Sequence, residues 1–242
     1  MFMLHKTFGA PKAGGGPAVG AYGCTDELAP YLPCPVVVKS GDRFVLDEDR
    51  PKSSGKVREF WGNVPQVVKA YAWARSMGAE GIQLASDISV VANNYRDKKL
   101  GEIPGLEISN PSLNVWRMEM TRWSLGPLTE ETGVTTVDFA NRMADYGIDP
   151  YWMSHEPWIV AEPFTPEAGE LWSKEDIDTW IGVIAQIADE ARSDPEMVKS
   201  APHNQAIAQV KGDVFEDPAK WAMTWRAHLR KKGLQDNGNG AG

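Results

Sequence analysis

The chain has 242 residues, 42% of them hydrophobic and 24% charged, and a formal net charge of −8 at pH 7. This length is sufficient for one large domain or two small ones with a sizeable core. The acidic balance argues against nucleic-acid binding, which needs clustered Lys and Arg, and no apolar run is long enough to span a bilayer. The two cysteines, Cys24 and Cys34, form neither a disulfide framework nor a metal-binding pattern. We therefore expect a metal-free cytoplasmic protein with reduced thiols.

The first quarter of the chain predicts short strands and loops. Residues 1–4 and 18–25 are predicted as strands, with a Gly/Ala/Pro loop over residues 9–18. Residues 35–47 predict a hairpin, because a Ser-Gly-Asp turn separates two runs rich in Val, Phe and Leu. The polar stretch 48–63 is predicted as a loop.

A helical pattern then covers residues 64–95, where Val67, Val68, Tyr71 and Ala74 share one face. Gly78 and Gly81 are expected to divide it into two helices. After a loop containing two prolines, residues 113–120 predict a strand.

Two further helices carry clear start and stop signals. Residues 133–147 predict a helix with Thr135 or Thr136 as N-cap and Gly147 at its end. Residues 173–195 predict a long helix with Ser173 as N-cap and Asp176 at its third position.

A strand is predicted over residues 158–164, so the second half alternates strand and helix and is expected to form an α+β sandwich. The Gly-rich tail over residues 231–242 is expected to be disordered.

The stretch HKTFGAPKAGGGP, residues 5–17, contains a candidate catalytic lysine. A lysine acts as a nucleophile when its amine forms an imine with an aldehyde such as pyridoxal 5'-phosphate. His5, Lys6 and Thr7 offer a ring, an amine and a hydroxyl, and the glycines allow close backbone approach to a ligand. No Gly-Lys-Ser/Thr closes the loop, so it is not a Walker P-loop. By composition alone, a surface lysine beside a flexible loop is the favoured interpretation.

Several separated motifs change that balance. They are HKTF with GGGP, ELAPYLP, DRPKSSGKVREFWGN, GVTTVDFANRMADYG and APH. In this order they resemble the C-terminal part of the pyridoxal-phosphate glycine dehydrogenase (decarboxylating), the P-protein of the glycine cleavage system. The resemblance is strongest to the second subunit of the two-subunit bacterial form and covers about residues 4–204.

The resemblance implies a cofactor and residues that hold it. Lys6 matches the Schiff-base lysine for pyridoxal 5'-phosphate, and His5 and Thr7 match positions beside that cofactor. Lys12 and the glycines that follow it match the substrate loop; these are Gly14, Gly15 and Gly16.

The resemblance also implies an α/β fold, the C-terminal part of a fold type I enzyme of the aspartate-aminotransferase kind. Residues 1–63 would be the C-terminal portion of the cofactor-binding large domain, and residues 64–205 the small α+β domain. Residues 206–242 would be a C-terminal extension with a disordered tail.

Two departures from the family pattern bear on the substrate. Lys12 stands where the family has a histidine, which replaces a group that titrates near neutrality by a permanent charge. The family's Glu-Pro-Thr-Glu-Thr-Glu run appears here as residues 162–167, with Phe164 in place of a threonine. Both changes leave open whether the substrate is glycine or another small amino acid.

In fold type I enzymes the aspartate on the pyridine nitrogen and most phosphate ligands precede the lysine, but only five residues precede Lys6. We therefore expect a partner chain to supply the N-terminal half of the cofactor domain, unless the sequence is a fragment. The resemblance further implies a first P-protein-like subunit and a lipoyl carrier protein as partners. Two alternatives stay open: a lyase or aldolase subunit acting on another amino acid, and a non-catalytic accessory subunit of a complete paralogue.

Two other groups of residues have a plain and a functional interpretation. Arg50, Lys52, Lys56 and Arg58 are either a solvated loop or an anchor for a carboxylate or the cofactor phosphate. His203 in APH is at least as well explained by a structural hydrogen bond as by catalysis.

Overall fold

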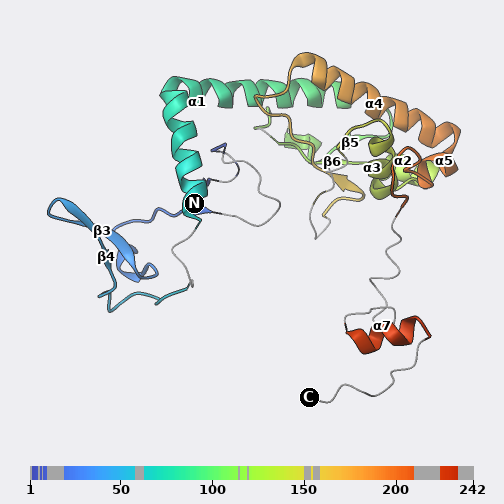
Figure 1. Cartoon of the computed structure of the whole chain (residues 1–242). Helices are drawn as coiled ribbons and strands as arrows, with labels where there is room; N and C mark the ends of the chain where they lie inside the picture. The colour runs from blue at the N-terminus through green and yellow to red at the C-terminus, as the bar shows by residue number, and fades with distance from the viewer. Residues whose placement is uncertain are drawn as a thin grey trace. The chain divides into compact units, whose positions relative to one another are not determined.

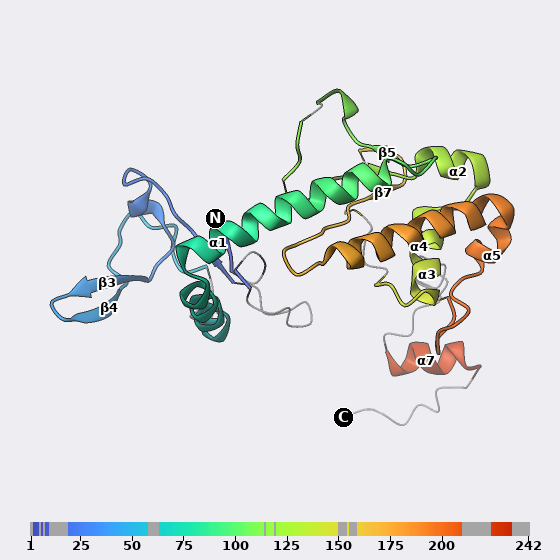
Figure 2. The same ribbon diagram turned by 90° about the horizontal axis from the view of Figure 1, so that it is seen from above.

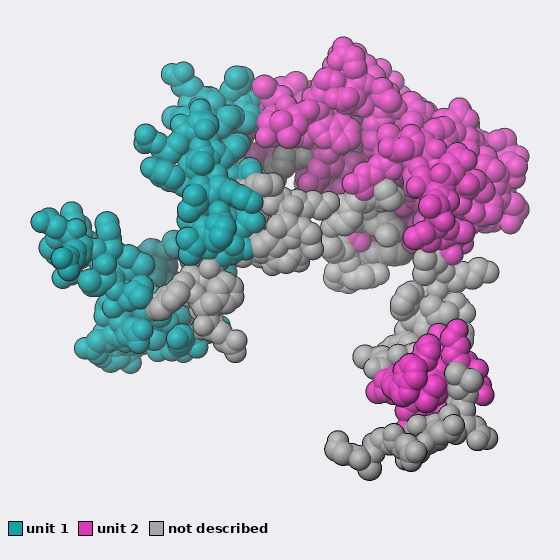
Figure 3. All heavy atoms as spheres, in the orientation of Figure 1, with its two compact units in different colours: residues 1–85 teal, residues 86–242 magenta. Residues whose placement is uncertain are grey.

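The structure is a computed structural model that describes residues 2–4, 6, 8–9, 19–57, 63–113, 115–118, 120–149, 154, 159–209 and 224–233. It divides into two compact units, residues 1–85 and 86–242 (Figure 3). The division falls within the long helix α1 (Val64–Leu100).

The first unit contains two small antiparallel strand pairs. β1 (Phe2–Met3) pairs with β2 (Gly20–Ala21), which places both predicted strands but makes each shorter than expected. β3 (Val36–Ser40) and β4 (Arg43–Asp47) form the predicted hairpin (Figure 1). A short 3-10 helix, η1 (Ala29–Tyr31), precedes it.

Helix α1 is broken at Gly78, as the sequence predicts. Gly78 has φ 65° and ψ −180°, a conformation outside the helical region, so two helical segments meet at a kink there. Only glycine adopts a positive φ at little cost, which explains the residue at this position. Gly81, the other predicted breaker, lies inside the second segment.

The second unit contains a three-stranded antiparallel sheet with the order β5-β6-β7. β5 (Glu107–Ile108) pairs with β6 (Trp123–Ser124), which pairs with β7 (Pro163–Phe164). A 3-10 helix, η2 (Pro111–Leu113), lies between the first two strands.

Besides the C-terminal part of α1, the described part of the second unit has the helices α2 (Gly126–Thr132), α3 (Thr136–Asp145), α4 (Lys174–Ser193), α5 (Pro195–Lys199) and α7 (Trp225–Lys231). α3 and α4 begin at the predicted residues: Thr135 and Ser173 each form a capping box. Asp194 ends α4, and its side chain then caps α5, whose first residue is Pro195. The mixed helix-and-sheet fold expected for this half is confirmed.

The core of the second unit lies between its helices and the sheet. Trp123 and Phe164 stack at a centroid distance of 6.5 Å across neighbouring strands, and both are buried. α4 lies beside the C-terminal half of α1 (Figures 1 and 2), where the Tyr95 hydroxyl donates to Asp178 at 2.5 Å. The fully buried side chains include Leu100, Leu125, Leu128, Val134, Phe139, Met143, Ile184, Ile187 and Val198.

The strand predicted over residues 113–120 is wrong. Residues 115–118 have no strand pairing, and Met120 makes only an isolated bridge to Glu167. The side chain of Asn94 takes the place of a neighbouring strand: its amide donates to the Arg117 carbonyl at 2.7 Å and accepts from the Arg117 N–H at 3.0 Å. The backbone is thereby satisfied without a ladder.

Residue 158 lies outside the described residues, and of residues 159–164 in the predicted strand only the last two form one, β7. Glu162 has φ 43°, in the left-handed region, which interrupts an extended run directly before β7. Its carbonyl accepts the Leu125 N–H at 2.9 Å, and its carboxylate accepts the N–H of Thr136 at 2.7 Å, at the start of α3. The strained residue thus joins the sheet to a helix N-terminus, where a carboxylate is favourable.

Among the described helices, none has the length and apolar character that crossing a bilayer would require. Cys24 is exposed, Cys34 is partly buried, and both are free thiols.

Candidate active site

Lys6 lies on a pair of consecutive turns directly after β1. Its N–H donates to the Met3 carbonyl at 3.1 Å, and its own carbonyl accepts the Gly9 N–H at 3.2 Å. The residue is exposed, and within the described ranges its side chain makes no hydrogen bond or ion pair. The two hydrogen bonds fix the Lys6 backbone in the turn, and its side chain is bonded to none of the described residues.

An aromatic cluster fastens this turn. Phe2 and Phe8 meet edge to face at 5.9 Å, and Phe8 meets Trp73 of α1 in the same way at 6.1 Å. Gly9, with φ 63°, lies against the Trp73 indole so closely that a Cβ atom there would lie 2.6 Å from the ring. The contacts of Trp73 were not predicted from the sequence, although an aromatic residue on a helix is an ordinary core signal.

The other predicted members of the site fall outside the described residues: His5, Thr7, Lys12, Gly14, Gly15 and Gly16. Their roles stay predictions.

Arg50 has a structural role. Its guanidinium donates to the Ala29 carbonyl at 2.6 Å and pairs with Asp47 at 3.4 Å. The side chain joins two loops and is only partly exposed. Lys52 is exposed, and Arg58 lies outside the described residues. The structure therefore supports a role for Arg50 in holding two loops together rather than in binding an anion.

A buried polar cluster in the second unit was missed by sequence reasoning. Arg96 donates to Asp97 at 2.8 Å and to the Pro166 carbonyl at 2.6 Å, and both side chains are buried. The Asp97 carboxylate also accepts from the Thr121 hydroxyl and from the Trp123 indole N–H, the latter at 3.1 Å. Burial lowers the pKa of Arg96, and Asp97 and Glu167 oppose that shift.

The sequence does contain a signal for this cluster. Asn93, Arg96, Asp97 and Leu100 are spaced i, i+3, i+4 and i+7, the spacing of a buried helix face. Polar residues at such positions indicate a buried network because buried polar groups need partners.

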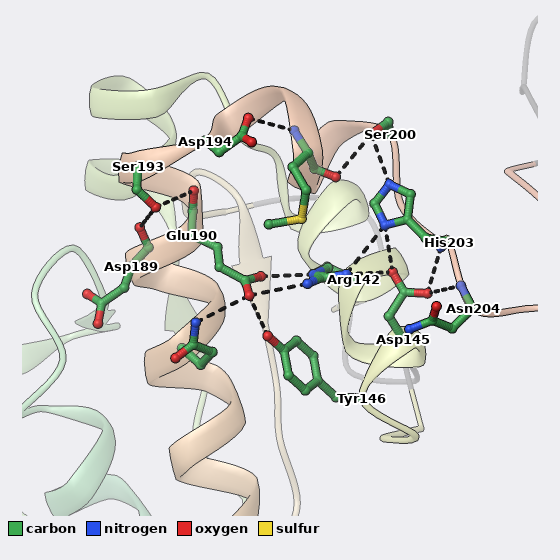
Figure 4. A network of polar contacts seen from close by, with 12 residues as sticks. Arg142, Asp145, Tyr146, Asp189, Glu190, Ser193, Asp194, Ser200, His203 and Asn204 are labelled. Atoms are coloured by element: carbon green, nitrogen blue, oxygen red, sulfur yellow. Dashed lines mark hydrogen bonds and ion pairs between the residues drawn. The ribbon is translucent and has the colours of Figure 1, made fainter.

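A second network joins α3, α4 and the segment after α5 (Figure 4). Arg142 pairs with Asp145 at 2.9 Å and with Glu190 at 2.8 Å, and Tyr146 donates to the same glutamate. Asp145 accepts the backbone N–H of His203 at 2.6 Å and that of Asn204 at 2.7 Å.

His203 lies between two side chains of this network. Its Nδ1 is 3.1 Å from the Asp145 carboxylate, and its Nε2 is 3.0 Å from Ser200 Oγ. Ser200 Oγ also donates to the Met197 carbonyl at 3.1 Å, and Arg142 Nη1 donates at 2.9 Å to the same Asp145 oxygen, Oδ2, that His203 Nδ1 contacts. The geometry favours the structural interpretation of His203, because each contact fastens the chain that leaves α5.

Acidification should weaken this network. Burial raises the pKa of Asp145, but the N–H of Asn204, the Arg142 guanidinium and the N–H of His203 outweigh it and hold that pKa below the ordinary value. The pKa of Glu190 is likewise lowered, because Arg142 and Tyr146 outweigh burial. Since both native pKa values lie below the unfolded ones, their contribution is complete above about pH 5 and is lost as the pH falls through the native values.

The measurement is the free energy of unfolding by urea from pH 3 to 7. Asp145→Asn should lower the free energy of unfolding at pH 7, and should reduce the loss of that free energy as the pH falls from 7 to 3. The matched control is Asp189→Asn, an exposed carboxylate on α4 that should change neither. An unchanged acid decline in Asp145→Asn would contradict the assignment.

Comparison with known proteins finds relatives that share one name. It is 40% identical over 231 residues to the probable glycine dehydrogenase (decarboxylating) subunit 2 of Thermococcus gammatolerans, a match that covers 95% of this chain and 45% of the relative. The protein of the same name from Caldanaerobacter subterraneus subsp. tengcongensis is 39% identical over 208 residues, which is 86% of this chain and 41% of the relative. This chain is similar to glycine dehydrogenase (decarboxylating) subunit 2. The predicted resemblance is therefore confirmed, although no protein-family model matches the chain.

A solved structure shows the same fold. The crystal structure of an inhibitor-bound glycine decarboxylase (P-protein) of the glycine cleavage system matches with a TM-score of 0.53 at 16% identity, covering 67% of this chain and 37% of that one. The expected fold class, the C-terminal part of fold type I, is confirmed. The chain spans less than half the length of the glycine dehydrogenase subunits it matches.

Proposed function

We propose that this chain is a subunit of a heteromeric, pyridoxal-phosphate-dependent glycine decarboxylase-like enzyme and that it contributes the Schiff-base lysine, Lys6. The observation that carries the proposal is the similarity to glycine dehydrogenase (decarboxylating) subunit 2 over 95% of the chain.

The residues of this chain fit the cofactor in part. Lys6 offers an amine on a fastened turn, as covalent attachment requires. The lysine is exposed, however, whereas enzymes activate such an amine by enclosing it in a pocket that excludes water. The remaining walls would come from a partner chain carrying the N-terminal half of the cofactor domain.

Bound pyridoxal phosphate supplies an electron sink for the bond broken at the substrate's α-carbon. Lys6 would hold the cofactor covalently, and its amine would also be placed to move a proton at the substrate's α-carbon. Glycine is the first candidate substrate, and CO2 would be its product. A lipoyl carrier protein would accept the remaining aminomethyl group. The cytoplasm is the proposed location.

Phe164 bears on the alternative substrate. It is a fully buried core residue stacked on Trp123, so packing explains its presence in place of the family's threonine. Lys12 and Phe164 are the two differences from the family pattern that favoured a lyase or aldolase acting on another amino acid. After this explanation of Phe164, only Lys12 still favours that alternative.

The test is borohydride reduction of the chain assembled with its partner and pyridoxal phosphate, followed by peptide mass spectrometry. The cofactor should be fixed on Lys6, and Lys6→Ala should abolish both this attachment and CO2 release from glycine. Lys98→Ala, an exposed lysine at the end of α1, is the control and should retain both.

Attachment to a lysine of the partner alone would reject the proposal and favour the accessory subunit. Attachment to Lys6 with activity on another amino acid and none on glycine would favour the lyase or aldolase.

A further inference from the structure

The β3–β4 hairpin exposes one apolar face. In its register Val37 lies opposite Leu46, and Lys39 lies opposite Phe44. Directly opposed residues of an antiparallel pair, and those two positions along, share a face. Val37, Lys39, Phe44 and Leu46 therefore form one side of the hairpin, named here the open face. Its apolar members Val37, Phe44 and Leu46 are 66%, 74% and 47% exposed.

The opposite face is better covered. Val36, Val38 and Asp47 are partly buried there, while Val45 is 43% exposed. The Asp47 carboxylate accepts hydrogen bonds from Arg50 and from the N–H of Asp49. The two faces thus differ, and the apolar side chains with the greatest exposure gather on one of them.

Hydrogen bonds between the segments that flank the hairpin fix its base, so the orientation of the open face does not depend on the hairpin ladder alone. Residues 29–34 and 50–55, which flank the hairpin, are hydrogen-bonded to each other. The bonds run from Arg50 Nη2 to the Ala29 carbonyl (2.6 Å), Ser53 Oγ to the Leu32 carbonyl (2.6 Å), the Ser54 N–H to the Tyr31 carbonyl (3.2 Å) and the Cys34 N–H to the Gly55 carbonyl (3.3 Å). These bonds hold both ends of the hairpin together independently of its own ladder.

A two-stranded hairpin is at best marginally stable in water, and a clustered apolar surface indicates an interface. The relatives indicate what covers it. The match extends over 95% of this chain but only 45% of the Thermococcus gammatolerans protein, so more than half of that protein has no counterpart here.

We propose that the open face packs against the part of the fold that corresponds to the unmatched portion of those relatives, carried by a second polypeptide. This inference rests on the proposed function for the existence of that partner and adds the surface it uses. The partner would offer apolar side chains to Val37, Phe44 and Leu46 and an acceptor to Lys39.

The probe is the unmatched segment of the Thermococcus gammatolerans subunit, expressed as a separate chain and mixed with the full 242-residue chain. Sedimentation velocity should show a complex, and hydrogen exchange of residues 36–47 should slow on its formation. Val37→Thr with Phe44→Thr keeps residues suited to strands, removes the apolar contacts and should weaken the complex at least tenfold. Trp116→Thr, which alters an 85% exposed side chain of the second unit, is the control and should bind normally.

Absence of the complex, or equal binding by the double variant, would overturn the proposal. So would self-association of the chain that the double variant abolishes, because the open face would then join two copies. Lys6→Ala separates this inference from the proposed function: it should bind the probe like the unaltered chain while losing cofactor attachment. Attachment on Lys6 with normal binding by the double variant would reject only the docking surface.

Discussion

Replacing Asp97 by alanine is expected to lower the free energy of unfolding by about 3–5 kcal/mol, because it leaves the buried guanidinium of Arg96 without its carboxylate. The Trp123 indole N–H and the Thr121 hydroxyl lose the same acceptor. A buried donor left without a partner retains its full desolvation cost. The effect should be measured by urea unfolding at pH 7, followed by circular dichroism.

The matched control is Glu102→Ala, which breaks the Lys99–Glu102 pair at the end of α1. That pair is 3.2 Å long, and its side chains are 35% and 57% exposed. Exposed pairs contribute at most about 1 kcal/mol, so this variant should unfold close to the unaltered chain. Similar decreases in the free energy of unfolding in the two variants would show that burial of the Arg96–Asp97 pair does not determine its contribution to stability.

Replacing Gly9 by alanine should displace the turn that holds Lys6. An alanine at φ 63° carries a left-handed penalty of about 1–2 kcal/mol, and its Cβ would lie 2.6–2.8 Å from atoms of the Trp73 indole. Relief of such overpacking costs about 1–3 kcal/mol more. The expected results are loss of the nuclear Overhauser contacts between residue 9 and the Trp73 ring, and, in the proposed assembly with the partner chain, at least a tenfold drop in borohydride-fixed cofactor on Lys6.

A double-mutant cycle with Trp73→Ala separates the two causes. Without the indole, Gly9→Ala should retain the φ penalty and lose the steric one, so the two substitutions should be non-additive. Strict additivity in cofactor attachment would show that Trp73 does not constrain the turn.

Local signals in the sequence were sufficient for the starts of α3 and α4 and for the hairpin, whereas α2, α5 and α7 were not predicted. The capping boxes at Thr135 and Ser173 involve residues three positions apart, so their hydrogen bonds need no tertiary partner. The same holds for the Ser-Gly-Asp turn of the β3–β4 hairpin and for the kink at Gly78, where glycine tolerates a positive φ.

Strand pairing could not be predicted in this way, because a strand depends on a neighbour distant in sequence. Residues 113–120 have strand-like composition, yet the Asn94 side chain satisfies the Arg117 backbone in place of a strand. The run before β7 is likewise interrupted by Glu162, which has a left-handed φ. Its carbonyl accepts the Leu125 N–H, directly after β6, and its carboxylate accepts the N–H of Thr136 at the start of α3.

For the candidate site, the sequence by itself determined which lysine to examine and which fold to expect, because its ordered motifs resemble the glycine dehydrogenase (decarboxylating) family, whereas composition alone favoured a surface lysine. Only the tertiary structure decided how that lysine is held, because Trp73 is 67 positions along the chain from Lys6 and no local pattern joins them. The same physical reason applies to Asp97, Thr121 and Trp123: hydrogen bonds and ring contacts between distant segments form only when the chain has packed.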